Sequence, residues 1–178
     1  MKRYLLIGAL VACSPALAFA QSGDNTVYGP STGDREFTIS GSGSSGTDLD
    51  QGAFGLDAEL GWYLTDHIEA GIQQSASWSG VDGGDDFWSA ATGGFANYQF
   101  GSGRLRPLVG ASLGYAYGNN VNESFYAGVG AGLKYYVLPS TFIQGGAEWQ
   151  FYFDDADDAN NAFDDGSFVY TLGVGFNF

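Results

Sequence analysis

The densest group of metal-binding side chains in the sequence is an acidic stretch near the C-terminus. Residues 154–165 hold six carboxylates within twelve positions, and carboxylate oxygens are ligands that Ca²⁺ and Mg²⁺ take in proteins. The spacing does not follow the EF-hand pattern, and no glycine stands at the turn position. We expect a solvated acidic loop, with a divalent-cation site as the alternative. The candidate ligands are Asp154, Asp155, Asp157, Asp158, Asp164 and Asp165.

Residues that would support catalysis are scarce. The single histidine, His67, lies in a stretch of turn residues, and no Ser/His/Asp constellation emerges around it. Glu59 and Glu69 could approach each other across one hairpin, but a glycosidase needs two carboxylates that flank an open cleft. The single cysteine, Cys13, excludes an internal disulfide and a Cys-rich zinc site. We expect no enzyme, no catalytic residue and no cofactor.

The length and charge of the chain narrow its class. A chain of 178 residues is expected to form one domain. Six basic residues against 20 acidic ones give a net charge of −14, which argues against nucleic-acid binding because such proteins need a basic patch. Aromatic residues make up 16% of the chain and hydrophobic residues 44%, enough to argue against disorder.

The first twenty residues have the layout of a secretory signal peptide. Lys2 and Arg3 precede a short apolar run, and residues 18–20 read Ala-Phe-Ala before Gln21, which matches a cleavage site. The apolar run is too short to span a membrane. Residues 10–13 resemble a lipobox, so a lipidated Cys13 is the alternative. We expect residues 1–20 to be removed and residues 21–34, rich in Ser, Gly, Asp and Asn, to form a flexible periplasmic leader.

The rest of the chain shows alternation with period two, which predicts β-strands. An uninterrupted apolar face of Leu, Val, Ile, Phe and Trp opposes a face of Gly, Ser, Gln, Tyr, Asp and Glu. Strands of about 11 residues rise about 36 Å and, at about 45° of tilt, cover about 25 Å of membrane normal. We therefore expect eight transmembrane strands. They fall within residues 35–43, 54–64, 68–78, 86–100, 105–115, 125–137, 142–153 and 168–178.

The connections support an eight-stranded antiparallel up-and-down transmembrane β-barrel over residues 35–178. Short turns at 64–67, 101–104 and 138–140 alternate with connections that are mostly longer, as in outer-membrane barrels with short periplasmic turns. An even strand number then places both termini in the periplasm. A soluble lipocalin-like barrel is the alternative, but it would turn the apolar face inward. Aromatic residues near strand ends fit interfacial girdles. They are Trp62, Trp78, Tyr98, Tyr135, Trp149 and Phe178.

Four charged residues point into the expected lumen: Glu59, Glu69, Arg106 and Lys134. They lie two to five residues from the short turns, so we expect a salt-bridge layer near that end. Charges in a low-dielectric interior must be paired, and such a layer would plug the barrel. The selectivity ring of a small pore is the alternative.

Inward glycines would leave a groove along one strand. We expect inward aromatic rings to pack over them, because eight strands leave an interior just wide enough for side chains to fill. The glycines are Gly128, Gly130 and Gly132, and the rings are those of Tyr126, Tyr136, Tyr152 and Phe95.

Residues 35–178 resemble the small eight-stranded outer-membrane β-barrels of the OmpA/OmpX type. Residues 64–71 resemble the first periplasmic turn of that superfamily, and residues 106–115 resemble its proline-started, glycine-alternating strand. The last strand resembles the signal read by the barrel-assembly machinery, with Phe178, Phe176 and Tyr170 as its residues. The resemblance implies a location in the outer membrane of a Gram-negative bacterium and gives little evidence about activity.

We expect a non-enzymatic outer-membrane barrel with a packed lumen. Its role would be in envelope integrity or surface interaction through acidic extracellular loops, which would contact lipid and lipopolysaccharide, the latter through divalent cations. A narrow pore for ions or small solutes is the alternative, and a lipid-modifying enzyme is the third reading. We expect a monomer that binds no nucleic acid.

Overall fold

The structure, a computed structural model, describes residues 27–45, 52–79, 87–119, 123–153 and 166–178. These ranges contain eight strands, at positions close to those expected from the alternation. The strands are β1 Arg35–Ser45, β2 Gly52–Tyr63, β3 Ile68–Ser79, β4 Phe87–Gln99, β5 Leu105–Gly118, β6 Ser124–Tyr136, β7 Thr141–Phe153 and β8 Ser167–Asn177. Among the described residues there is no helix of the length and hydropathy that a transmembrane helix requires.

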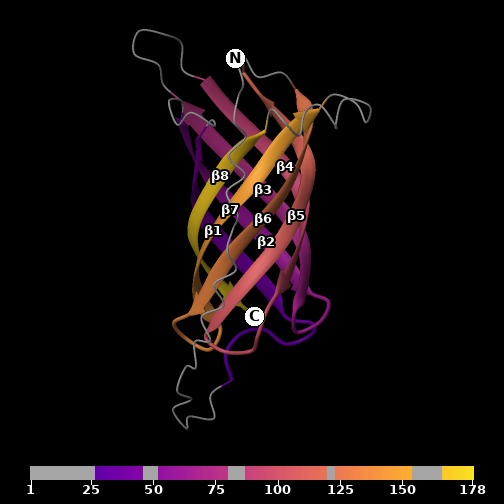
Figure 1. Ribbon diagram of the computed structural model, residues 1–178, viewed down its shortest axis with the longest axis vertical. Coiled ribbons are helices and arrows are strands. Elements are labelled where there is room, and N and C mark those ends of the chain that lie inside the picture. The colour runs from indigo at the N-terminus through magenta and orange to yellow at the C-terminus, as the bar shows by residue number, and fades with distance from the viewer. Residues whose placement is uncertain (1–26, 46–51, 80–86, 120–122, 154–165) are drawn as a thin grey trace, which may run out of the picture.

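Each strand pairs antiparallel with its neighbours in the chain, and β1 also pairs with β8, so the sheet closes into a barrel of tilted strands (Figure 1). Phe37, for example, lies opposite Leu60 of β2 on one side and Phe176 of β8 on the other. Closure leaves no strand edge unpaired. The expected eight-stranded antiparallel up-and-down barrel is confirmed.

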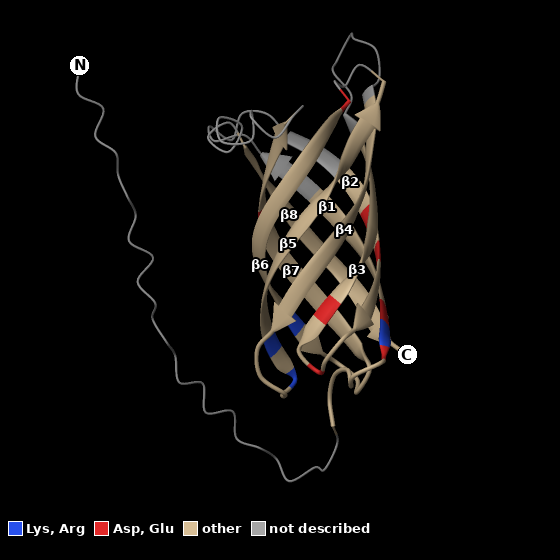
Figure 2. Cartoon of the chain, turned by 90° about the vertical axis from the view of Figure 1, so that its right-hand side faces the viewer, with Lys and Arg blue, Asp and Glu red and all other residues tan. Residues whose placement is uncertain are grey.

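The two ends of the barrel differ. Connections 64–67, 100–104 and 137–140 form one end, here called the turn end, and β1 begins and β8 finishes there. The other end, here called the loop end, carries the connections 46–51, 80–86, 119–123 and 154–166. Figure 2 shows the Lys and Arg residues of the described ranges gathered toward the turn end.

The apolar face points outward along the barrel. Leu113, Ile72 and Leu172 are 59%, 58% and 69% exposed, whereas Thr38, Lys134 and Tyr136 on the inner face are 0% exposed. An outward apolar surface is stable in lipid and unfavourable in water. The orientation of the two faces is thus the one expected for a membrane barrel and the reverse of a lipocalin-like one.

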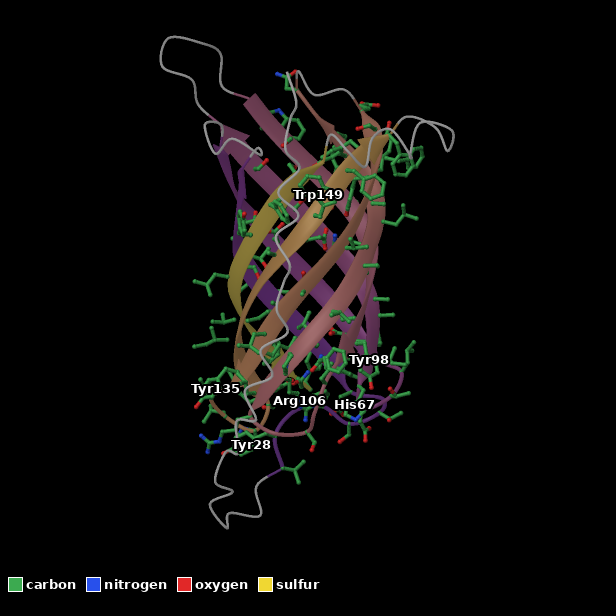
Figure 3. All side chains as sticks on the ribbon, viewed as in Figure 1. Tyr28, His67, Tyr98, Arg106, Tyr135 and Trp149 are labelled. Carbon is green, nitrogen blue, oxygen red and sulfur yellow. The ribbon has the colours of Figure 1, made fainter. Side chains whose placement is uncertain are left out.

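Aromatic side chains occur on the outer surface near both ends (Figure 3). Tyr98, Tyr135 and Phe178 lie exposed at the turn end, while the half-buried Trp149 lies toward the loop end, its ring 4.7 Å from that of Phe168. This arrangement matches the aromatic girdles of membrane barrels.

Candidate functional site

A buried lysine sits at the centre of the lumen near the turn end. Lys134 of β6 reaches across the barrel, and its Nζ lies 2.5 Å from Oε1 of Glu36 and 3.2 Å from Oε2 of Glu69. None of the three side chains is more than 2% exposed. Inward projection follows from the alternation of β1, β3 and β6, and pairing is required because an isolated charge in this interior would be strongly unfavourable.

Polar side chains from three further strands complete the hydrogen bonding of these charges. The Tyr63 hydroxyl donates to Oε2 of Glu36 at 2.5 Å and accepts from Nε2 of Gln99. Asn177 Nδ2 donates to the same Glu36 oxygen at 3.0 Å. These donors offset the second negative charge, which the single lysine leaves uncompensated. The Lys134 cluster is defined as Lys134, Glu36, Glu69, Tyr63, Gln99 and Asn177.

The structure brings together only two of the four charged residues expected to form the layer, namely Glu69 and Lys134. Glu59 makes no ion pair or hydrogen bond among the described residues and lines a cavity instead. Arg106 lies directly opposite Lys134 in the β5–β6 register, where like charges repel. The two side chains diverge, and Arg106 turns to the turn end.

Glu36 is the principal member that the sequence reasoning missed. It lies on the inner face of β1, in the alternation phase expected for that segment, and one residue from the start of the strand. This inward position near the turn end was the feature of the sequence that could have predicted that Glu36 belongs to the charged layer. Its contact with Lys134 crosses the lumen between strands that are not paired, so strand pairing alone gives no indication of it.

Two aromatic rings and a guanidinium close the barrel below the cluster. Tyr136 and Phe142 are completely buried, with ring centroids 5.3 Å apart. The Phe142 ring centroid lies 4.7 Å from Lys134 Nζ, and the Arg106 guanidinium lies 5.3 Å from the Tyr136 ring centroid. With these residues and the Lys134 cluster, every strand of the barrel contributes at least one side chain to the closure.

The segment before β1 forms an outer cap on this end, close to Arg106 (Figure 3). Arg106 donates to the Tyr28 carbonyl at 2.5 Å, and Arg104 donates to the Tyr28 hydroxyl and stacks on its ring. The Gly29 amide donates to the Pro139 carbonyl at 2.8 Å. Gly29 has φ +87°, a conformation that favours glycine, and a Cβ there would displace the Arg106 guanidinium.

The cap extends to the next turn. The Gly33 amide donates to the Tyr63 carbonyl at 2.8 Å, and the amide and hydroxyl of Thr32 both donate to Oδ1 of Asp66 at 2.7 Å. These bonds hold the Asp66 carboxyl pKa below its usual range. The expectation of a flexible leader over 21–34 therefore differs from the structure for residues 27–34, which make hydrogen bonds to all three turns at this end. Residues 21–26 lie outside the described residues.

Above the Lys134 cluster the lumen is not completely filled. A cavity of about 270 Å³ lies between the cluster and the loop end, with Leu108 and Phe95 in its lower wall. The inward rings do pack over glycines, but on other strands than expected: Tyr126 covers Gly93 and Gly114, and Phe95 covers Gly71. Gly128 is covered by Glu148 and Ser112, and Gly130 and Gly132 face the cavity.

The remaining candidate residues lie outside the Lys134 cluster. The His67 ring lies 6.1 Å from that of Tyr98 at the turn end, and its Nδ1 has no partner within the described residues. In the described ranges no three His, Cys, Asp or Glu side chains are grouped to hold a metal.

The acidic candidates of 154–165, the proposed signal peptide and Cys13 lie outside these ranges. Phe178, Phe176 and Tyr170 are exposed on the outer surface.

Comparison with known proteins agrees with this geometry. The family model described as the OprF membrane domain matches residues 3–178. Outer membrane porin F of Pseudomonas aeruginosa is 32% identical over 187 residues, covering 98% of this chain and 50% of the relative. The chain thus spans about half the length of that curated relative.

Solved structures show the same fold. The N-terminal β-barrel domain of Pseudomonas aeruginosa OprF superposes with a TM-score of 0.63 at 26% identity, covering 84% of this chain and all of that one. Neisserial surface protein A superposes with a TM-score of 0.60 at 18% identity, covering 82% of this chain and 96% of that one. The expected resemblance to small eight-stranded outer-membrane barrels is confirmed, and the chain belongs to the OprF membrane domain family of outer-membrane β-barrel proteins.

Proposed function

We propose that this protein is a non-enzymatic outer-membrane barrel, closed at its turn end, that acts in envelope integrity or surface interaction through its acidic loops. The observation that most directly supports a barrel that does not conduct is the closure of its turn end. The side chains of the Lys134 cluster are at most 8% exposed, and they are backed by Tyr136 and Phe142 and then by the Tyr28–Arg106 cap. In this proposal the turn end faces the periplasm and the loops face the exterior.

The closure is tested by single-channel recording in a planar bilayer with the refolded chain. We expect no conductance steps from the unmodified protein, because the buried cluster spans the lumen. Removal of residues 21–34 should leave the bilayer silent, since the cluster and the two rings remain. Truncation of Lys134, Glu36 and Glu69 together with Tyr136 and Phe142 to alanine should produce steps, because both layers that span the lumen are then removed. Steps from properly folded unmodified protein would contradict the closure.

A narrow pore is the second candidate, supported by the cavity of about 270 Å³ above the cluster and by the porin name of the relative. If the unmodified protein conducts, neutralising Lys134 or Arg106 should change the ratio of cation to anion permeability. Glu123→Gln is the matched control, because Glu123 is exposed and lies outside the cavity. An unchanged ratio would assign the current to another path.

The surface role is tested through the stretch 154–165. Replacing its six aspartates by asparagine should leave the barrel folded, as judged by heat-modifiable migration on a gel. We expect the cells to become more sensitive to chelators and detergents, because carboxylates that bridge to lipopolysaccharide phosphates through Ca²⁺ or Mg²⁺ are lost. Unchanged sensitivity would exclude the bridging role. Altered lipid A on deletion of the protein would instead indicate an enzyme.

A further inference from the structure

The cavity above the Lys134 cluster carries an excess of negative charge. Asp57, Glu59 and Glu148 line it, and no Lys, Arg or His is among its lining residues in the described part of the chain. The nearest cation, Lys134, is already paired with Glu36 and Glu69. Asp57 and Glu59 on β2 and Glu148 on β7 thus place three carboxyl groups around one cavity.

The three carboxylates differ in how they are satisfied. Glu148 Oε1 accepts from Ser112 Oγ at 2.8 Å and from Gln150 Nε2 at 2.7 Å. Oδ2 of Asp57 has no hydrogen-bond partner although the atom is buried. Glu59 is enclosed by protein on nearly all sides, makes no hydrogen bond with the described residues, and faces the cavity. Glu59 therefore has unused hydrogen-bonding capacity and faces the cavity, and Asp57 lines the same cavity two residues away on β2.

Negative charge held inside the barrel in this way is unfavourable unless a positive occupant or protons accompany it. The described residues offer no group of three ligands for a metal ion, whereas a protonated amine needs only acceptors. The acceptors lie on two separate strands: Asp57 and Glu59 on β2, and Glu148 on β7. The wall includes Gly130, Gly132 and Gly146, whose small size leaves room for a methylene chain.

We propose that the cavity is a binding site for a short aliphatic diamine. One ammonium group donates to Glu59 and Asp57, the other donates to Glu148, and the methylene chain lies along the glycine wall. The Tyr152 ring also lines the cavity, and aromatic rings attract ammonium groups. About 270 Å³ exceeds the space of a few water molecules, each of which needs roughly 10–15 Å³ on this measure. The site does not depend on the proposed role of the acidic loops.

The test is isothermal titration of the refolded full chain in detergent micelles with 1,4-diaminobutane at near-physiological salt. We expect saturable binding of one molecule per barrel that weakens as salt is raised. Butane-1,4-diol has the same length without the charges and should not bind. The Glu59→Gln and Glu148→Gln variants should each lose affinity at least tenfold, while Glu123→Gln, the same change outside the cavity, should bind as the unmodified protein does.

Loss of binding by Glu59→Gln would not result from misfolding. The substitution removes an uncompensated charge, so the empty barrel should be at least as stable as before. Heat-modifiable migration checks this for each variant. Absence of saturable binding, or equal affinity in the unmodified protein and both lumen variants, would overturn the proposal. Equal heats with sodium and with the diamine would show a site for cations in general and overturn the diamine assignment.

Discussion

Lys134 illustrates how a single residue holds a lumen closed. Within the described residues, its ammonium is the only positive charge in contact with Glu36 and Glu69, so Lys134→Met would leave these two buried carboxylates uncompensated. Breaking one partner of a buried ion pair costs about 3–5 kcal/mol. We expect the variant to lose a similar free energy of unfolding, measured by urea titration in lipid vesicles near neutral pH.

The matched control changes all three charges together. A variant with Lys134→Met, Glu36→Gln and Glu69→Gln keeps similar side-chain volumes and leaves no charge in the Lys134 cluster. Replacement of a whole buried ion pair is often close to neutral, so this variant should recover most of the lost stability. If it is as unstable as Lys134→Met alone, packing rather than charge pairing explains the loss.

Asp66 gives a residue-level prediction about pH. Its carboxyl pKa is lowered because Thr32 donates two hydrogen bonds to the carboxylate. The stabilisation from this contact is therefore complete above the ordinary Asp value of about 4, and it is lost as pH falls through the lowered pKa. The Thr32 amide resonance should titrate with a midpoint below that of an ordinary aspartate. Asp66→Asn should abolish the titration, and a midpoint at or above the ordinary value would contradict the contact.

At the level of elements, the cap of residues 27–34 contains two glycines that both have a positive φ. Gly29 and Gly33 have φ of +87° and +96°, but a Cβ at Gly29 meets Arg106 whereas one at Gly33 meets nothing within 4 Å. Alanine at either position costs about 1–2 kcal/mol of backbone strain. Gly29→Ala adds the displacement of Arg106, so its cap should be cleaved much faster in limited proteolysis than that of Gly33→Ala. Equal rates would show that the Arg106 contact does not hold the cap.

The strands themselves were predictable because successive residues along a barrel strand face the lipid and the lumen alternately. Leu56 and Trp62 face outward and Tyr63 inward, as the period of two requires. The partners of an inward side chain were not predictable in this way. Lys134 meets Glu36 across the lumen and Arg106 meets Tyr28 beyond the strand end, and both contacts depend on barrel curvature and side-chain length, which period and register do not encode.

At the scale of the whole molecule, the structure divides the barrel into a sealed end and an end with an internal cavity. The seal uses side chains from all eight strands, and the cap adds a second layer outside it. The cavity remains because Gly130, Gly132 and Gly146 line one wall without side chains. The two ends of the barrel therefore differ, and the effect of the protein on the envelope depends on which end faces the cell exterior.

The orientation of the barrel in the membrane can be measured with single cysteine substitutions. Ser102 is exposed in the 100–104 turn and Asn119 is exposed at the loop end, so Ser102→Cys and Asn119→Cys report the two ends. In intact Gram-negative cells, a membrane-impermeant maleimide should label Asn119→Cys and should label Ser102→Cys only after the outer membrane is permeabilised. The reason is that short turns of such barrels face the periplasm. The unmodified chain is the control, because labelling there would mean that Cys13 remains in the mature protein. Labelling of Ser102→Cys alone in intact cells would reverse the orientation, and the cavity would then open toward the periplasm and sample periplasmic solutes rather than external ones.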